Sequence, residues 1–221
     1  MIAARLRQRP RSRGGMAPCA LLCVVLAIEG ATGGDDGPSP IDEPPRWNSA
    51  ALARLRSPPL GLPPVAVPEE NPPTAQKIAL GRRLFFDRRL SVNNTMSCAM
   101  CHVPEQGFTS NELATPIGVG GRSLKRNAPT ILNVAYAGHL FHDGREISLE
   151  TQAVAPLIAR DEMANPSIGW LVARIARLAD YRERFEQAFG GGPSMERIGQ
   201  AIASWERTLL SGDSRVGSAQ E

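Results

Sequence analysis

Ser97-Cys98-Ala99-Met100-Cys101-His102 is the stretch around which the rest of the chain is organised. Cys-x-x-Cys-His is the attachment pattern of a c-type haem. Two thiols at this spacing can form thioethers with the two vinyl groups of one porphyrin, and the adjacent imidazole can bind the iron. We therefore interpret Cys98 and Cys101 as attachment residues for one covalent haem c and His102 as the axial ligand of its iron.

Two other interpretations of the motif compete with haem. A redox dithiol would use the two cysteines but gives no special place to His102. A tetrahedral zinc site needs a fourth ligand, and only His139 and His142 remain to supply it. The shortage of ligands and the specificity of the motif favour haem.

The composition suits one domain with tails, because 42% of the 221 residues are hydrophobic. The formal net charge is +3, but much of the positive charge lies within the first 13 residues. Since the basic balance is local, we expect no nucleic-acid partner. The arginines concerned are Arg5, Arg7, Arg9, Arg11 and Arg13.

Residues 1–31 are typical of a secretory signal peptide, with an Arg-rich start, an apolar run from Ala17 to Ile28 and small residues after it. That run is shorter than the roughly 18 to 20 residues of a transmembrane helix, so we expect no transmembrane span. The predicted location is the periplasm, or secretion, after cleavage. Cys19 and Cys23 lie in the leader, which leaves no pair for a structural disulfide in the exported chain.

Residues 32–73 are predicted to form a linker or arm, because prolines are dense and no hydrophobic period is sustained. A short helix around Trp47–Leu55 is the one regular piece expected there. The remaining pattern predicts helices and no strands, so the fold class is all-α. The expected segments are a helix after the N-cap Thr74 ending near Asp87, an irregular stretch from Ser91 to Pro129, a helix 149–158 capped by Ser148 and kinked at Pro156, a helix begun by Asn165-Pro166, a short helix from Asp180 to Gly190, and a last helix from Met195 to Leu210.

Two of these helices have an apolar face that we expect to be core. The face of the helix after Asn165-Pro166 comprises Ile168, Leu171, Val172, Ile175 and Leu178. The face of the last helix comprises Ile198, Ile202, Trp205 and Leu209.

Several motifs together resemble one family. They are Leu80–Asp87 (LGRRLFFD), Cys98–His102, Arg126–Thr130 (RNAPT), Phe141–Arg145 (FHDGR) and Glu162-Met163. In this order they resemble the N-terminal, peroxidatic haem domain of bacterial dihaem cytochrome c peroxidases, including MauG-like enzymes. The resemblance covers about 74–215, which we expect to be a cytochrome c-like haem domain, with 216–221 as a tail.

The resemblance implies an activity and roles for named residues. The family reduces hydrogen peroxide with electrons from a small redox protein such as a cytochrome c or cupredoxin. His102 is then the proximal ligand, Glu162 the acid/base on the peroxide side, and Gln152 a residue of the distal pocket. A sequestered carboxylate suits this task because it can take a proton from one peroxide oxygen and return one to the leaving oxygen.

The chain departs from the family at several positions. Val119 stands where many members have a histidine that ligates the resting iron, which implies an open distal position unless His139 or His142 takes that place. His142 also replaces a Trp between the two haems. Asn127 matches a residue that helps to bind calcium, but the other calcium ligands would come from a second domain.

The printed sequence has one Cys-x-x-Cys-His, whereas the family continues into a second haem domain. Two alternatives to a peroxidase therefore stay open. One is a single-haem electron-transfer cytochrome with Met96, Met100 or Met163 opposite His102. The other is an inactive, truncated peroxidase.

Overall fold

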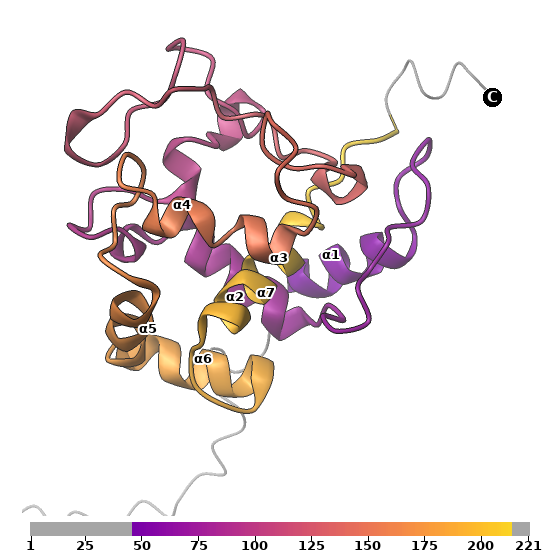
Figure 1. The fold of residues 1–221 in the computed structure, drawn as a ribbon. Coiled ribbons are helices and arrows are strands. Elements are labelled where there is room, and N and C mark those ends of the chain that lie inside the picture. The colour runs from indigo at the N-terminus through magenta and orange to yellow at the C-terminus, as the bar shows by residue number, and fades with distance from the viewer. Residues whose placement is uncertain (1–45, 214–221) are drawn as a thin grey trace, which may run out of the picture. The chain divides into compact units, whose positions relative to one another are not determined.

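A computed structural model of the chain describes residues 46–213 (Figure 1). The predicted signal peptide, the first part of the arm and the tail lie outside these residues. The described part consists of helices joined by long irregular segments, and its only β-type pairing is a set of isolated bridges. The prediction of an all-α fold is confirmed.

Seven α-helices and several short 3₁₀ turns make up the regular structure of residues 46–213. The α-helices are α1 (Arg46–Arg56), α2 (Ala75–Phe86), α3 (Leu149–Gln152), α4 (Ala155–Ile158), α5 (Ile168–Ala176), α6 (Ala179–Phe189) and α7 (Met195–Glu206). The 3₁₀ turns are Arg88–Leu90, Cys98–Met100, Pro104–Gln106, Val119–Gly121 and Val134–Tyr136.

The core is built on the crossing of α2 and α7. Thr74 caps α2 as predicted, and its side chain accepts a hydrogen bond from the Lys77 N–H. The two helices approach so closely that a Cβ on Gly81 would lie 1.8 Å from the carbonyl oxygen of Ala201. Phe85 and Trp205 pack beside this crossing with ring centroids 4.4 Å apart. The pair lies beside the Cys-x-x-Cys-His motif, because Phe85 also contacts the His102 ring.

The start of α5 differs from the prediction. Ser167, not Asn165, is the N-cap, and its hydroxyl accepts a hydrogen bond from the Trp170 N–H. Asn165 is buried instead, and its amide donates to the carbonyl oxygens of Leu90 (2.6 Å) and Leu157 (2.7 Å). Of the expected apolar face, Leu171 and Ile175 are buried. Ile168 was wrongly assigned to the core, since it lies in the first turn and is 43% exposed.

The segment predicted as one helix over 149–158 forms two. Ser148 caps α3 as expected, but the break falls at Ala153-Val154, and Pro156 lies in the first turn of α4, where its missing N–H costs no hydrogen bond. The last helix ends at Glu206 rather than Leu210, because the following residues form tighter turns onto Trp205 and Glu206.

The short helix expected from Asp180 to Gly190 is present as α6, and Gly190 ends it in the left-handed conformation with φ of 64°. The helix expected around Trp47–Leu55 is present as α1. No helix within residues 46–213 is both long enough and apolar enough to cross a membrane.

Residues 91–147 are mostly irregular, as predicted for their first part, and Figure 1 shows them as long loops beside α3 and α4. The arm that precedes α2 packs on the end of the described chain. Arg54 Nη2 donates to the Leu210 carbonyl (2.8 Å), and the Asp213 N–H donates to the Leu60 carbonyl (2.9 Å). The loops supply part of the walls of the site described next.

Candidate haem site

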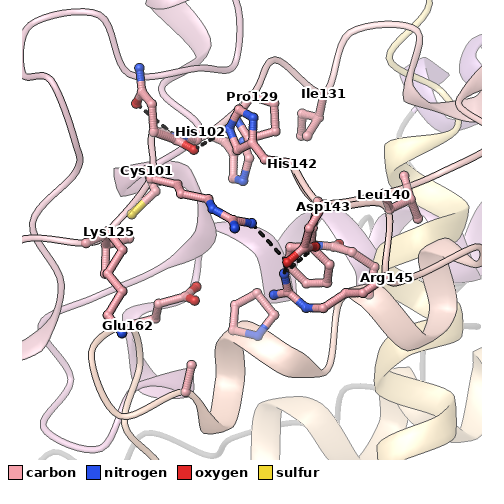
Figure 2. A pocket seen from close by; sticks show the side chains of 18 of the residues that line it. Cys101, His102, Lys125, Pro129, Ile131, Leu140, His142, Asp143, Arg145 and Glu162 are labelled. Carbon is pink, nitrogen blue, oxygen red and sulfur yellow. Dashed lines mark hydrogen bonds and ion pairs between the residues drawn. The ribbon is translucent and has the colours of Figure 1, made fainter.

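A cavity of about 440 Å³ lies beside the Cys-x-x-Cys-His motif (Figure 2). Its walls are Cys101 and His102, the loops 124–131 and 140–145, and side chains from α3, α4 and 159–162. A smaller, more apolar cavity of about 60 Å³ shares some of these walls and reaches Cys98. The site therefore has an inner, thiol-lined end and an outer, polar end.

The motif folds as a single 3₁₀ turn, in which the Cys101 and His102 N–H groups both donate to the carbonyl of Cys98 (3.1 and 2.9 Å). This turn brings both cysteines to the cavity walls. The two thiols are free and half-buried. Burial first, and then the charge of Glu162, raises the pKa of Cys101 to about 11; burial raises the pKa of Cys98 as well. Both sulfurs are thus protonated at neutral pH.

His102 is oriented by the loop that follows it. Its Nδ1 lies 3.1 Å from the carbonyl oxygen of Phe108, which assigns the proton to Nδ1 and leaves the Nε2 lone pair for a metal. Burial lowers the pKa of His102, so the ring stays neutral. A neutral imidazole of fixed orientation on the cavity wall is what an axial ligand requires.

The structure brings the predicted reacting residues to the same cavity. Gln152, the last residue of α3, and Glu162, which follows α4, both line the larger and the smaller cavity together with His102. Glu162 is half-buried. Burial raises its pKa, and the nearby charge of Arg145 acts in the opposite direction. Glu162 therefore has the environment of a proton-exchanging carboxyl.

The Gly-rich turn fixes the backbone at Glu162. The Val119 N–H donates to the Glu162 carbonyl (2.9 Å), and a Cβ on Gly118 would lie 1.8 Å from the carbonyl oxygen of Asp161. Only glycine allows this approach. Val119 itself is buried and has no atom that can bind iron.

The other candidate ligands differ in position. Met96 and Met163 are buried and line the smaller cavity, whereas Met100 is 40% exposed and lines neither. His142 lines the larger cavity, and its Nε2 lies 2.9 Å from the Asn127 carbonyl. His139 is exposed and lines neither cavity.

Asn127 uses its amide within the chain. Its Nδ2 donates to the Ser110 carbonyl (2.8 Å), and its Oδ1 accepts from the Ala128 N–H (2.8 Å). Within residues 46–213, no three His, Cys, Asp or Glu side chains meet in a way that could hold a metal ion. Calcium binding by Asn127 stays a prediction.

Sequence reasoning missed two features of the cavity. Lys125, Arg126 and Arg145 place cationic side chains at its outer end, and Arg126 and Arg145 both pair with Asp143. Glu206 lines both cavities from α7 and is buried. A signal for Glu206 was present, because it continues the i, i+4 spacing of Ile198 and Ile202 and so lies on the buried face.

These residues fit a covalent haem. The free thiols and the apolar walls lie at the inner end, and His102, whose Nδ1 is held by the Phe108 carbonyl, lines the same space. Because thioethers hold the vinyl edge of a porphyrin, its two carboxylates must point away from the thiols. The cations at the outer end suit those carboxylates. The buried Oε2 of Glu206 also has no hydrogen-bond partner, which indicates that a bound group in this cavity interacts with it.

Known proteins agree with this fit. The family model described as "Di-haem cytochrome c peroxidase" matches residues 75–219. Methylamine utilization protein MauG of Methylophilus methylotrophus is 43% identical over 148 residues, which are 66% of this chain and 44% of that protein. Cytochrome c peroxidase Ccp of Escherichia coli is 38% identical over 148 residues, or 67% of this chain and 32% of that protein.

Solved structures give the same result. A MauG-like protein associated with microbial copper homeostasis superposes with a TM-score of 0.66 at 37% identity, covering 72% of this chain and 47% of that one. The chain thus spans less than half the length of these relatives. The match over 75–219, together with the helical fold and the Cys98–His102 site, shows that the chain belongs to the di-haem cytochrome c peroxidase family.

Proposed function

We propose that this chain reduces hydrogen peroxide at one covalent haem, with electrons from a small redox protein such as a cytochrome c or cupredoxin. The observation that carries the proposal is the position of Glu162 and Gln152 on the walls of the cavity that also contains Cys101 and His102. Relatives described as cytochrome c551 peroxidase, such as that of Nitrosomonas europaea at 39% identity, support the same reaction class.

The chain's own residues divide the work. Cys98 and Cys101 would hold the haem and His102 would bind its iron, and the bound haem would supply the redox chemistry that splits the O–O bond with the donor's electrons. Glu162 accepts a proton from one peroxide oxygen and returns it to the other, and its raised pKa places this exchange closer to neutral pH than for an ordinary carboxyl. Gln152, which lines the same cavity, has an amide that can hydrogen-bond the peroxide. The Val119 contact keeps the backbone of Glu162 in place.

The electrons must come from outside this haem. Reduction of one peroxide to water takes two electrons, and a single haem iron supplies them only with a donor. A donor protein reaches such a site most easily after export, so the proposal includes a periplasmic location following cleavage of residues 1–31.

A second candidate function is electron transfer by a six-coordinate haem. Met96 and Met163 favour it, because both thioethers are buried on the wall of the smaller cavity. The resting ferric spectrum separates the two functions. A high-spin spectrum supports the peroxidase, and a low-spin His/Met spectrum supports the carrier.

The direct test is the Glu162→Gln variant. We expect full haem content and a peroxide turnover slower by about a hundredfold or more, since loss of a general acid/base has effects of this order. Glu105→Gln is the matched control, because Glu105 is exposed and lines neither cavity. Turnover of Glu162→Gln equal to that of the control would remove Glu162 from the mechanism.

A further inference from the structure

Glu206 is a buried carboxyl that the proposed reaction does not use. It is the last residue of α7, only 6% exposed, and it lines both the inner and the outer part of the haem cavity. Its Oε2 has no hydrogen-bond partner. Buried carboxyl oxygens are normally paired, so this atom lacks a partner that another group must supply.

The charged groups around Glu206 do not supply that partner. Arg207 is the nearest cation in sequence, but its guanidinium donates to Glu150 through Nη1 (2.6 Å) and Nη2 (3.1 Å). Glu150 and the Cys98 thiol, the other groups that interact electrostatically with Glu206, offer no positive charge. Burial raises the pKa of Glu206 to about 8, and Arg207 offsets only part of that effect. The cations at the outer end of the cavity, Lys125, Arg126 and Arg145, are not among the charges that act on the pKa of Glu206. The remaining source of positive charge is therefore whatever fills the cavity.

A ferric haem with a neutral histidine ligand carries one more positive charge than the ferrous form. A carboxylate buried at the cavity wall interacts with this charge in a medium of low dielectric constant, where the attraction is much stronger than in water. The attraction stabilises the ferric form over the ferrous form. No atom is transferred, because the step is the uptake of one electron by the iron.

We propose that Glu206 is the electrostatic partner of the haem, and that its carboxylate holds the reduction potential below the value that the same site would have with a neutral residue there. This inference rests on the haem attachment in the proposed function but not on peroxide turnover. The proposal gives different roles to the two carboxyls of the cavity, Glu162 and Glu206. Glu162 handles protons, whereas Glu206 sets how readily the iron accepts an electron.

The test compares Glu206→Gln, which has nearly the same shape but no charge, with wild type. The midpoint potential is measured by spectroelectrochemical titration at pH 9, where the wild-type carboxyl is ionised. We expect the ferrous-to-ferric ratio at a fixed potential to rise at least tenfold, which is a shift of about 59 mV for one electron. Glu206→Asp, which keeps the charge, should stay close to wild type. Glu196→Gln, an exposed change on the same helix, is the matched control.

The proposal is overturned by a Glu206→Gln potential equal to that of the Glu196→Gln control. It is also overturned if Glu206→Gln and Glu206→Ala lose the haem while Glu206→Asp keeps it, since the residue would then serve attachment rather than potential. Haem content from the pyridine haemochrome spectrum decides this. Peroxide and donor are absent from the titration, so a failure of the peroxidase proposal leaves this result unchanged.

Discussion

Glu150 and Glu206 are both largely buried carboxyls beside the end of α7, but their surroundings are opposite. Glu150 accepts hydrogen bonds from Arg207, Asn71 and Ser148, and these outweigh burial and lower its pKa to about 2. Glu206 has no hydrogen bond to Oε2, and burial raises its pKa to about 8. The comparison shows that two adjacent residues at the end of α7, Glu206 and Arg207, have different roles. Arg207 forms a buried ion pair with Glu150, and Glu206 lines the cavity proposed for the haem.

The largest effect on stability is expected from Arg207→Met, which removes the buried ion pair between Arg207 and Glu150. Arg207 and Glu150 have side chains only 6% and 16% exposed, so the variant leaves a buried charge without its partner. We expect the free energy of unfolding at pH 7 to fall by about 3–5 kcal/mol. Urea unfolding followed by circular dichroism measures it.

The pH dependence of the free energy of unfolding provides the control for Arg207→Met. A carboxyl whose folded-state pKa is depressed contributes stability above its ordinary pKa of 4.5, and this is lost as the pH falls towards 2. The wild type should show this loss and Arg207→Met should lack it. The double variant Glu150→Gln/Arg207→Met should regain most of the stability. No regain would mean that the pair does not account for the loss.

A smaller effect, on the pKa of Glu162 in the haem cavity, is expected from Arg145→Leu. Arg145 lowers the pKa of Glu162 against the effect of burial, so its removal raises that pKa further. Since Glu162 must be ionised to accept a proton, the acid limb of the kcat/KM profile for peroxide should move to higher pH. Stopped-flow assays between pH 4 and 8 measure the limb. An unmoved limb would show that Arg145 and Glu162 are not coupled.

The smallest effect is expected from Arg126→Leu, which also removes one guanidinium from Asp143. Arg126 and Asp143 are 56% and 40% exposed, and ion pairs in solvent contribute little to stability. Its unfolding curve should overlay that of wild type, in contrast to Arg207→Met. It also serves as the control for Arg145→Leu, because Arg126 pairs with the same aspartate but is not among the charges that shift the pKa of Glu162. A destabilisation as large as that of Arg207→Met would contradict the distinction between buried and exposed pairs.

The sequence was sufficient where one local rule decides the structure. The cap at Thr74, the end of α6 at Gly190 and the buried face of α7 follow from capping chemistry and apolar spacing. It failed at Asn165, where two carbonyl groups distant in sequence outcompete the capping position. It also missed Glu206, because a charged residue at a helix end usually faces solvent and only the fold shows the cavity beside it.

The loops around the cavity could be located but not traced from the sequence. Their course depends on single contacts such as that of Thr130 Oγ1 with the Gly107 carbonyl (2.6 Å), which leave no periodic pattern. The close approach of Gly118 to Asp161 is of the same kind. The motifs therefore predicted the haem attachment residues together with Gln152 and Glu162, whereas Glu206 and the cations on the cavity wall came from the structure.

The hydrogen bonds of Asn71 determine where a stable fragment of the chain must begin. Its amide donates to Glu150 (2.7 Å) and to the Gln200 carbonyl (3.0 Å), while its Oδ1 accepts from Lys77 Nζ (3.1 Å). It lies upstream of residue 75, where the family match begins. A fragment cut at the family boundary would remove a donor from Glu150, the buried carboxylate that pairs with Arg207. The smallest unit that folds with its full stability therefore starts before Asn71, inside the Pro-rich arm.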